Sequence, residues 1–150
     1  MEKLRVEKKD IYTIEVNDKG ETIEFDLADI SLSFKCIKAL EEIDKIKQNA
    51  KMREIAISKK EDVEGKYMSK KEEEILKVWQ ETFIEMRKAM DIFLGDGACK
   101  KIFGDRNYIE MYDDLMEQLL PHLDKMKISF DGMKNRIVQK YSEDKKNVIE

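Results

Sequence analysis

The sequence predicts a mainly helical protein of the α+β class, with an N-terminal β-hairpin followed by four to five helices. Three observations support this fold class. One proline and six glycines in 150 residues leave long runs of residues that favour helices. Strict alternation of apolar and polar residues occurs over residues 11–27, which is typical of strands. Beyond that segment, apolar residues recur every three or four positions, as in amphipathic helices.

The predicted hairpin arm covers residues 11–27. Its alternating apolar residues are Tyr12, Ile14 and Val16 in the first strand, and Ile23, Phe25 and Leu27 in the second. Residues 17–20, Asn-Asp-Lys-Gly, suit a type I turn closed by a left-handed glycine. Because two strands alone are only marginally stable in water, we expect the apolar face to lie on a helix, or an edge to pair with another chain.

The first helix is predicted over residues 31–52, with Ser31 or Ser33 as its N-cap. Its apolar stripe comprises Phe34, Ile37, Leu40, Ile43 and Ile46. Residues 53–67 are rich in charge, lose the helical period and include Gly65, which together predict a flexible linker.

The strongest helical pattern follows Ser69, which forms a capping box with Glu72. Its apolar positions are Ile75, Trp79, Phe83, Met86, Met90 and Phe93. Burying a side chain such as Phe83 contributes about 1.5–3 kcal/mol, so we expect this stripe to face another surface. Gly95 is placed to end the helix as a left-handed C-cap.

Residues 94–104 hold three of the six glycines and predict a structural joint between two amphipathic segments. The residues assigned to the joint are Gly95, Gly97, Ile102, Phe103 and Gly104. Asp96 is expected to cap a short helical turn that Gly104 ends. Ile102 and Phe103 are expected to anchor this corner in the core.

The C-terminal part predicts two more helices. Asp105 or Asn107 is expected to cap the first of them, which has a broad apolar face: Ile109, Met111, Tyr112, Leu115, Met116, Leu119 and Leu120. Pro121, the single proline, is expected to kink or end it. Ser129 is expected to cap a last helix carrying Phe130, Met133, Ile137, Val138 and Tyr141. Residues 142–150 are polar and predicted to fray.

Length and composition predict a single domain over residues 1–150 in the cytoplasm. The 29 basic and 33 acidic residues nearly cancel, which argues against nucleic-acid binding. The sequence contains neither a signal-peptide pattern nor a membrane-length apolar run. Cys36 and Cys99 lie far apart and are expected to be reduced, partly buried thiols.

No set of residues predicts a catalytic, cofactor or metal site. Gly95 and Gly97 follow a helix and lack the Gly-Lys-Ser or Gly-Lys-Thr of a phosphate loop. The acidic residues around Asp113 lack metal-ligand spacing and are expected to be solvated. His122, the single histidine, is expected to cap a helix end or lie at the surface. The nine methionines either fill the core or line an adaptable binding groove.

One motif has a more specific pattern: Phe-Leu-Gly-x-Gly-x-x-x-Lys-Ile-Phe-Gly over residues 93–104. A hairpin, a helix, a charged linker and a second helix precede it, and Tyr-Asp-Asp-Leu at residues 112–115 follows it. This arrangement, over residues 11–126, resembles the tail assembly chaperones of long-tailed phages and prophages of low-GC Gram-positive bacteria. The motif is the specific part, whereas the hairpin and helices are generic.

The resemblance implies a non-enzymatic protein of the bacterial host cytoplasm that binds the tape measure protein and keeps it soluble during tail tube assembly. Self-association and contact with the tail tube protein are further expectations, without cofactor, nucleic acid or membrane. A tape measure is a long amphipathic helix, so its partner needs an apolar groove and a charged outer surface. The expected partner-binding residues are Trp79, Phe83, Met86, Met90, Tyr112 and Met116.

An alternative is a small helical regulatory or structural adaptor that self-associates through its apolar helix faces. In that case residues 1–27 would pair strands across subunits. An enzyme is the least favoured class, because the residues that catalysis needs do not occur together in a recognisable pattern.

Overall fold

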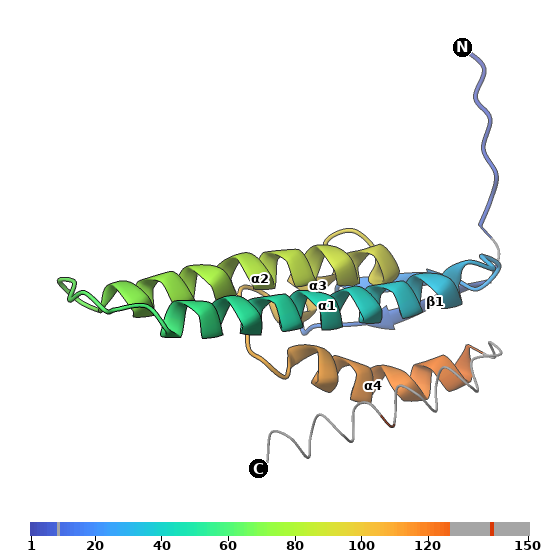
Figure 1. The fold of residues 1–150 in the computed structure, drawn as a ribbon. Helices are drawn as coiled ribbons and strands as arrows, with labels where there is room; N and C mark the ends of the chain where they lie inside the picture. The colour runs from blue at the N-terminus through green and yellow to red at the C-terminus, as the bar shows by residue number, and fades with distance from the viewer. Residues whose placement is uncertain (9, 127–138, 140–150) are drawn as a thin grey trace. The chain divides into compact units, whose positions relative to one another are not determined.

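The computed structural model describes residues 1–8, 10–126 and 139 (Figure 1). Its elements are β1 (Ile11–Glu15), β2 (Thr22–Asp26), α1 (Leu32–Ser58), α2 (Lys70–Leu94), α3 (Ala98–Phe103) and α4 (Met111–Lys125). The predicted fold class is therefore confirmed: a two-stranded hairpin precedes four helices in the described chain. The chain forms two compact units, residues 1–33 with 100–150 and residues 34–99, which are described separately. The single domain predicted from the length stays a prediction.

The hairpin forms as its alternation predicts. Tyr12 pairs with Phe25 and Ile14 pairs with Ile23, so the apolar side chains share one face. Gly20 has a φ of +80° and its amide donates to the Asn17 carbonyl at 3.1 Å, which confirms the predicted turn.

The apolar face of the hairpin lies near α4 within the same unit. The Tyr12 hydroxyl and the His122 Nδ1 atom are 2.8 Å apart. From α3, the Lys101 ammonium donates to the Thr22 carbonyl at 3.0 Å. The expectation that a helix supports the hairpin is confirmed.

Helix α1 extends to Ser58, so its predicted end at residue 52 is too early. The predicted linker over residues 53–67 is wrong for residues 53–58, which are helical. The reason is a seven-residue spacing that continues through charged sequence and ends with Ile57. Ile57 is buried and packs with Ala50 and Val78. The buried residues of α1 are Leu32, Cys36, Ala39, Ile43, Ala50 and Ile57.

Most of the stripe predicted for this helix is less covered than expected. Phe34 is 61% exposed, and Ile43 alone among the five predicted residues is buried. Small residues such as Cys36 and Ala39 occupy the packed face instead, because they allow a close approach of another helix. The contacts before α1 also differ from the predicted serine cap. The Ser31 amide and hydroxyl both donate to the Asp29 carboxylate.

The segment between α1 and α2 is fixed by Asp62. Its Oδ1 atom accepts the amides of Val63 at 2.9 Å and Lys71 at 3.1 Å. These hydrogen bonds, the one from the Lys71 amide above all, lower the pKa of Asp62. Helix α2 then begins after Ser69, whose hydroxyl accepts the Glu72 amide at 3.2 Å, as the capping box predicts.

The joint after α2 contains three glycines with positive φ, and Gly95 ends α2 as predicted, although its ψ of 155° lies outside the left-handed helical region. Gly95, Gly97 and Gly104 have φ values of +107°, +76° and +63°. The predicted cap of α3 is wrong, because the carboxylate at its first turn belongs to Asp91 rather than Asp96. Asp91 accepts the amide of Gly97 at 3.2 Å and that of Cys99 at 2.9 Å. The last turn of α2 thus supplies the cap of α3.

Helix α4 begins at Met111, later than a cap at Asp105 or Asn107 predicts. Its first turn is preceded by a bend in which the Met111 amide donates to the Tyr108 carbonyl. Helix α4 also continues through Pro121 to Lys125, and the buried Leu123 and Met126 follow the proline, so it does not end there. The helix predicted after Ser129 and the fraying predicted for residues 142–150 lie outside the described residues.

Candidate functional site

The six residues predicted to bind a partner have different environments. Met86 and Met90 in α2, and Tyr112 and Met116 in α4, are all buried. Trp79 and Phe83 are half-buried, and their ring centroids are 6.0 Å apart. The Trp79 indole nitrogen donates to a Glu54 carboxylate oxygen at 3.3 Å. A partner could therefore reach Trp79 and Phe83 without rearrangement of the chain, but not the other four side chains.

The joint residues show mixed burial. Gly95 and Gly97 are exposed, whereas Ile102, Phe103 and Gly104 are half-buried. The Phe103 ring packs edge-to-face against Tyr108 and Tyr112, with centroids 6.3 and 5.8 Å away. The expectation that Phe103 anchors this corner agrees with these contacts.

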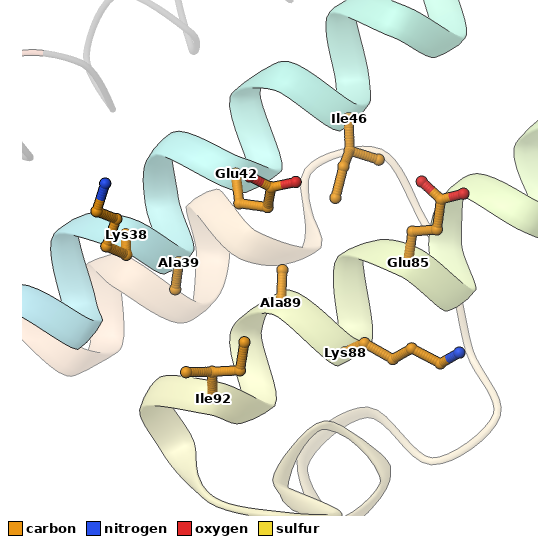
Figure 2. Close-up of a pocket in the computed structure, with 8 residues that line it drawn as sticks. All are labelled: Lys38, Ala39, Glu42, Ile46, Glu85, Lys88, Ala89 and Ile92. Atoms are coloured by element: carbon orange, nitrogen blue, oxygen red, sulfur yellow. The ribbon is translucent and has the colours of Figure 1, made fainter.

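Two grooves lie along the seam between α1 and α2, both within residues 34–99. We call the first the open groove; it has a volume of about 510 Å³ and is shown in Figure 2. It is lined from α1 by Lys38, Ala39, Glu42 and Ile46, and from α2 by Glu85, Lys88, Ala89 and Ile92. These positions recur every three or four residues, so they follow one flank of each helix.

The floor of the open groove is apolar and made of small side chains. Ala39 and Ala89 point toward the space between the two helices (Figure 2), and both are buried. Ile92 lies beside them with 66% of its surface exposed. Ile92 and the half-buried Ile46 are therefore the apolar side chains that a partner in the groove would contact.

The rim of the open groove carries charges of both signs. Lys38 and Glu42 stand on α1, and Glu85 and Lys88 stand on α2. Within the part of the chain that the structure describes, none of these four side chains forms an ion pair. The Lys38 ammonium lies over the Phe34 ring, 5.3 Å from its centroid, so the charges of Glu42, Glu85 and Lys88 are those that remain available to a partner in the groove.

The second groove, which we call the bridged groove, has a volume of about 400 Å³ and lies nearer the loop between α1 and α2. Ion pairs cross it to α2 from α1 and from the residues just after α1. Arg53 contacts Glu81 at 3.2 Å, and Lys60 contacts Glu74 at 3.7 Å. These pairs occupy the charges on its rim, so we place the candidate binding surface at the open groove.

Sequence reasoning did not find the open groove. It selected the largest apolar side chains, whereas the groove is formed by alanines that leave space. The signal that was available is the recurrence of Ala39 and Ile46 on one helix, and of Ala89 and Ile92 on the other, at helical spacing.

His122 differs from its prediction. It is half-buried within α4 and contacts Tyr12, with the two ring centroids 5.8 Å apart in an edge-to-face arrangement. It neither caps the helix end nor lies free at the surface. The two residues are 110 positions apart in the sequence, which explains why no local pattern indicates this contact.

In the described part of the chain, neither the thiols nor the acidic residues form a reactive or metal-binding site. Cys36 and Cys99 form no disulfide with each other, and both are more completely buried than the predicted partly buried thiols. Burial raises the pKa of the Cys36 thiol to about 12. At neutral pH this thiol is protonated and a poor nucleophile. Among residues 1–8 and 10–126, no three His, Cys, Asp or Glu side chains form a group that could hold a metal ion. No helix in the described chain has the length and hydropathy needed to span a membrane.

Comparisons with known proteins do not assign the chain to a family. No family model, no curated protein and no solved structure matches it. Function is therefore argued from the open groove and from the motif at residues 93–104.

Proposed function

We propose that this protein is a non-enzymatic phage tail assembly chaperone that binds the tape measure protein. In this role it keeps the tape measure protein soluble in the bacterial host cytoplasm while the tail tube assembles. The observation that carries the proposal is the open groove, an apolar strip between unpaired charges of both signs. The motif over residues 93–104 agrees with the same role through its resemblance to such chaperones.

The open groove suits an amphipathic helix on physical grounds. Packed helices lie about 8–10 Å apart, and small side chains such as Ala39 and Ala89 permit that approach. Covering Ile92 would contribute about 1.5–3 kcal/mol, which is a substantial part of a moderate affinity. The charges on the rim would pair with polar residues that flank the apolar stripe of the bound helix.

The adaptor alternative has less support. It would use the apolar helix faces for self-association, yet Met86, Met90 and Met116 on those faces are already buried within the chain. A self-associating adaptor would need other surfaces, and the open groove does not by itself favour a second copy over a foreign helix.

The test is co-expression with the tape measure protein of the same phage, followed by measurement of soluble tape measure protein and of a co-eluting complex. We expect the unmodified chain to raise solubility. Ile92→Glu, which places a charge on the groove strip, should lower recovery of the complex about tenfold.

Ile84→Glu is the matched control. Ile84 lies on the same helix, is 57% exposed and lines neither groove, so recovery should change less than about twofold. If the unmodified chain leaves the tape measure protein insoluble, the chaperone role is wrong. If both variants reduce recovery equally, the open groove is not the binding site.

A further inference from the structure

The outer edge of β1 is open in the described chain. The sheet has two strands, and the Val16 amide donates to the Glu21 carbonyl across them at 2.9 Å. This bond fixes the even-numbered residues of β1 as those whose backbone groups face β2. The amides and carbonyls of Ile11, Thr13 and Glu15 therefore point away from β2, where no described strand pairs with them.

The apolar residues of β1 are less covered than those of β2. Ile23 and Phe25 are buried, whereas their partners Ile14 and Tyr12 are only half-buried. A groove of about 170 Å³ adjoins β1 on this face, lined in part by Ile14, Val16, Leu115 and Leu119. A strand added beside β1 would cover this apolar surface.

Residues 1–8 have the pattern of such a strand, and we call them the arm. Leu4 and Val6 alternate with charged residues, and they are 95% and 89% exposed. The segment from Lys3 to Glu7 has five residues, the same length as β1. Its two apolar side chains would gain burial on a sheet face, since alternation places both of them on the same side.

The charges of the arm complement those of the hairpin. The face of the hairpin opposite its apolar side chains carries Glu15, Glu24 and Asp26, a run of acidic residues on neighbouring strands. When Leu4 and Val6 face the apolar side, Lys3, Arg5 and Glu7 lie on this acidic face, where Lys3 falls opposite Glu15 and Glu7 falls opposite the uncharged Ile11. Opposite charges on neighbouring strands stabilise the pairing.

The arm does not pair with its own β1 in the structure, since residues 1–8 form no strand there and Leu4 and Val6 are exposed. A two-residue turn before Ile11 would set Leu4 opposite Glu15, and antiparallel partners point to the same face. Leu4 would then lie on the charged face. A three-residue turn over residues 8–10 would set Glu7 opposite Ile11 and Leu4 opposite Ile14, so pairing within one chain is the competing arrangement that the mass and disulfide measurements below distinguish.

We propose that the arm of a second copy of this chain pairs antiparallel with the outer edge of β1, and that the exchange is mutual. In this register Leu4 lies opposite Ile14 and Val6 lies opposite Tyr12, on the apolar face of the sheet. Lys3 lies opposite Glu15 on the other face. The two chains thereby form a symmetric dimer with two three-stranded sheets, each made of the hairpin of one copy and the arm of the other. This inference does not depend on the proposed chaperone function.

The first test measures the mass of the full chain by analytical ultracentrifugation over a range of concentrations. We expect a monomer–dimer equilibrium that deletion of residues 1–8 abolishes. Thr13→Pro removes an amide from the outer edge of β1 and should raise the dissociation constant about tenfold or more. Glu24→Pro, at the paired position on the opposite edge of the sheet, is the control and should leave the dimer intact.

The second test fixes the register with cysteines. Lys3→Cys combined with Glu15→Cys should form a disulfide between two chains on mild oxidation, while Lys3→Cys with Glu24→Cys should not. The native cysteines are buried and do not interfere. A monomer at every concentration, a dimer that survives removal of the arm, or a disulfide within one chain would each overturn the proposal.

Discussion

The two halves of the α1–α2 seam have similar helices but different surfaces. Near the connecting loop, the seam is crossed by Arg53–Glu81 and Lys60–Glu74. At the other half, the open groove has alanines on its floor and unpaired charges on its rim. The same helical period therefore produces a surface whose charges are paired across the seam in one half, and a surface without such ion pairs in the other. A binding surface is therefore more readily sought in the half of the seam whose charged side chains form no ion pairs with one another.

The core beneath the bridged groove should contribute more to stability than the ion pairs above it. Ile57 packs with Ala50 and Val78, whereas Arg53 and Glu81 are about half exposed, at 49% and 59%. Burial of an aliphatic side chain generally outweighs an exposed ion pair by several-fold. Three sets of substitutions, ordered by expected effect, test this comparison between the halves.

The largest effect is expected at Ile57. Ile57→Ala should lower the free energy of unfolding by about 2–4 kcal/mol, because it removes buried atoms and leaves a cavity in a packed cluster. Trp79, the single tryptophan, packs against the same cluster and reports the transition by fluorescence during urea denaturation. Ile57→Val is the control and should cost about 0.5–1.5 kcal/mol. Equal losses for the two variants would show that this cluster is not closely packed.

An intermediate effect should distinguish the two halves directly. Ala50→Leu adds volume to the packed half and should cost about 1–3 kcal/mol through overpacking. Ala89→Leu adds the same volume beside the open groove, which has space for it, and should cost less than about 1 kcal/mol. Both are measured by urea denaturation. A cost for Ala89→Leu as large as that for Ala50→Leu would mean that the open groove cannot accept a further side chain.

The sequence predicted element types well and surfaces less well. The hairpin, its Gly20 turn, the Ser69 cap and the glycine that ends α2 were all predictable, because each depends on residues close together in the chain. Helix α1 was predicted too short because Ile57 continues the stripe after a charged stretch that resembles a linker. The late start of α4 was missed because the preceding bend is stabilised by aromatic contacts of Phe103 with Tyr108 and Tyr112.

The candidate site was less predictable for a physical reason. Large apolar residues such as Met86 and Met90 were selected, but those are the residues a fold buries first. The open groove depends instead on where side chains are small and on which charges find partners across the seam. The position of the small side chains and the pairing of the charges both depend on how α1 packs with α2. They cannot be predicted from the amphipathic pattern of one helix alone.

The smallest effect should come from the ion pairs of the bridged groove. Arg53→Ala should lower the free energy of unfolding by about 0.2–1 kcal/mol, since the pair with Glu81 is half exposed and solvent weakens it. The coupling between the two residues is obtained from a double-mutant cycle with Glu81→Ala, measured at low and high salt. A coupling free energy that falls with salt agrees with a surface ion pair. The main role of such a pair is to neutralise charges that would otherwise be available to a partner. A coupling well above 1 kcal/mol that salt does not change would mean that the bridges, rather than the core around Ile57, hold this half of the seam together.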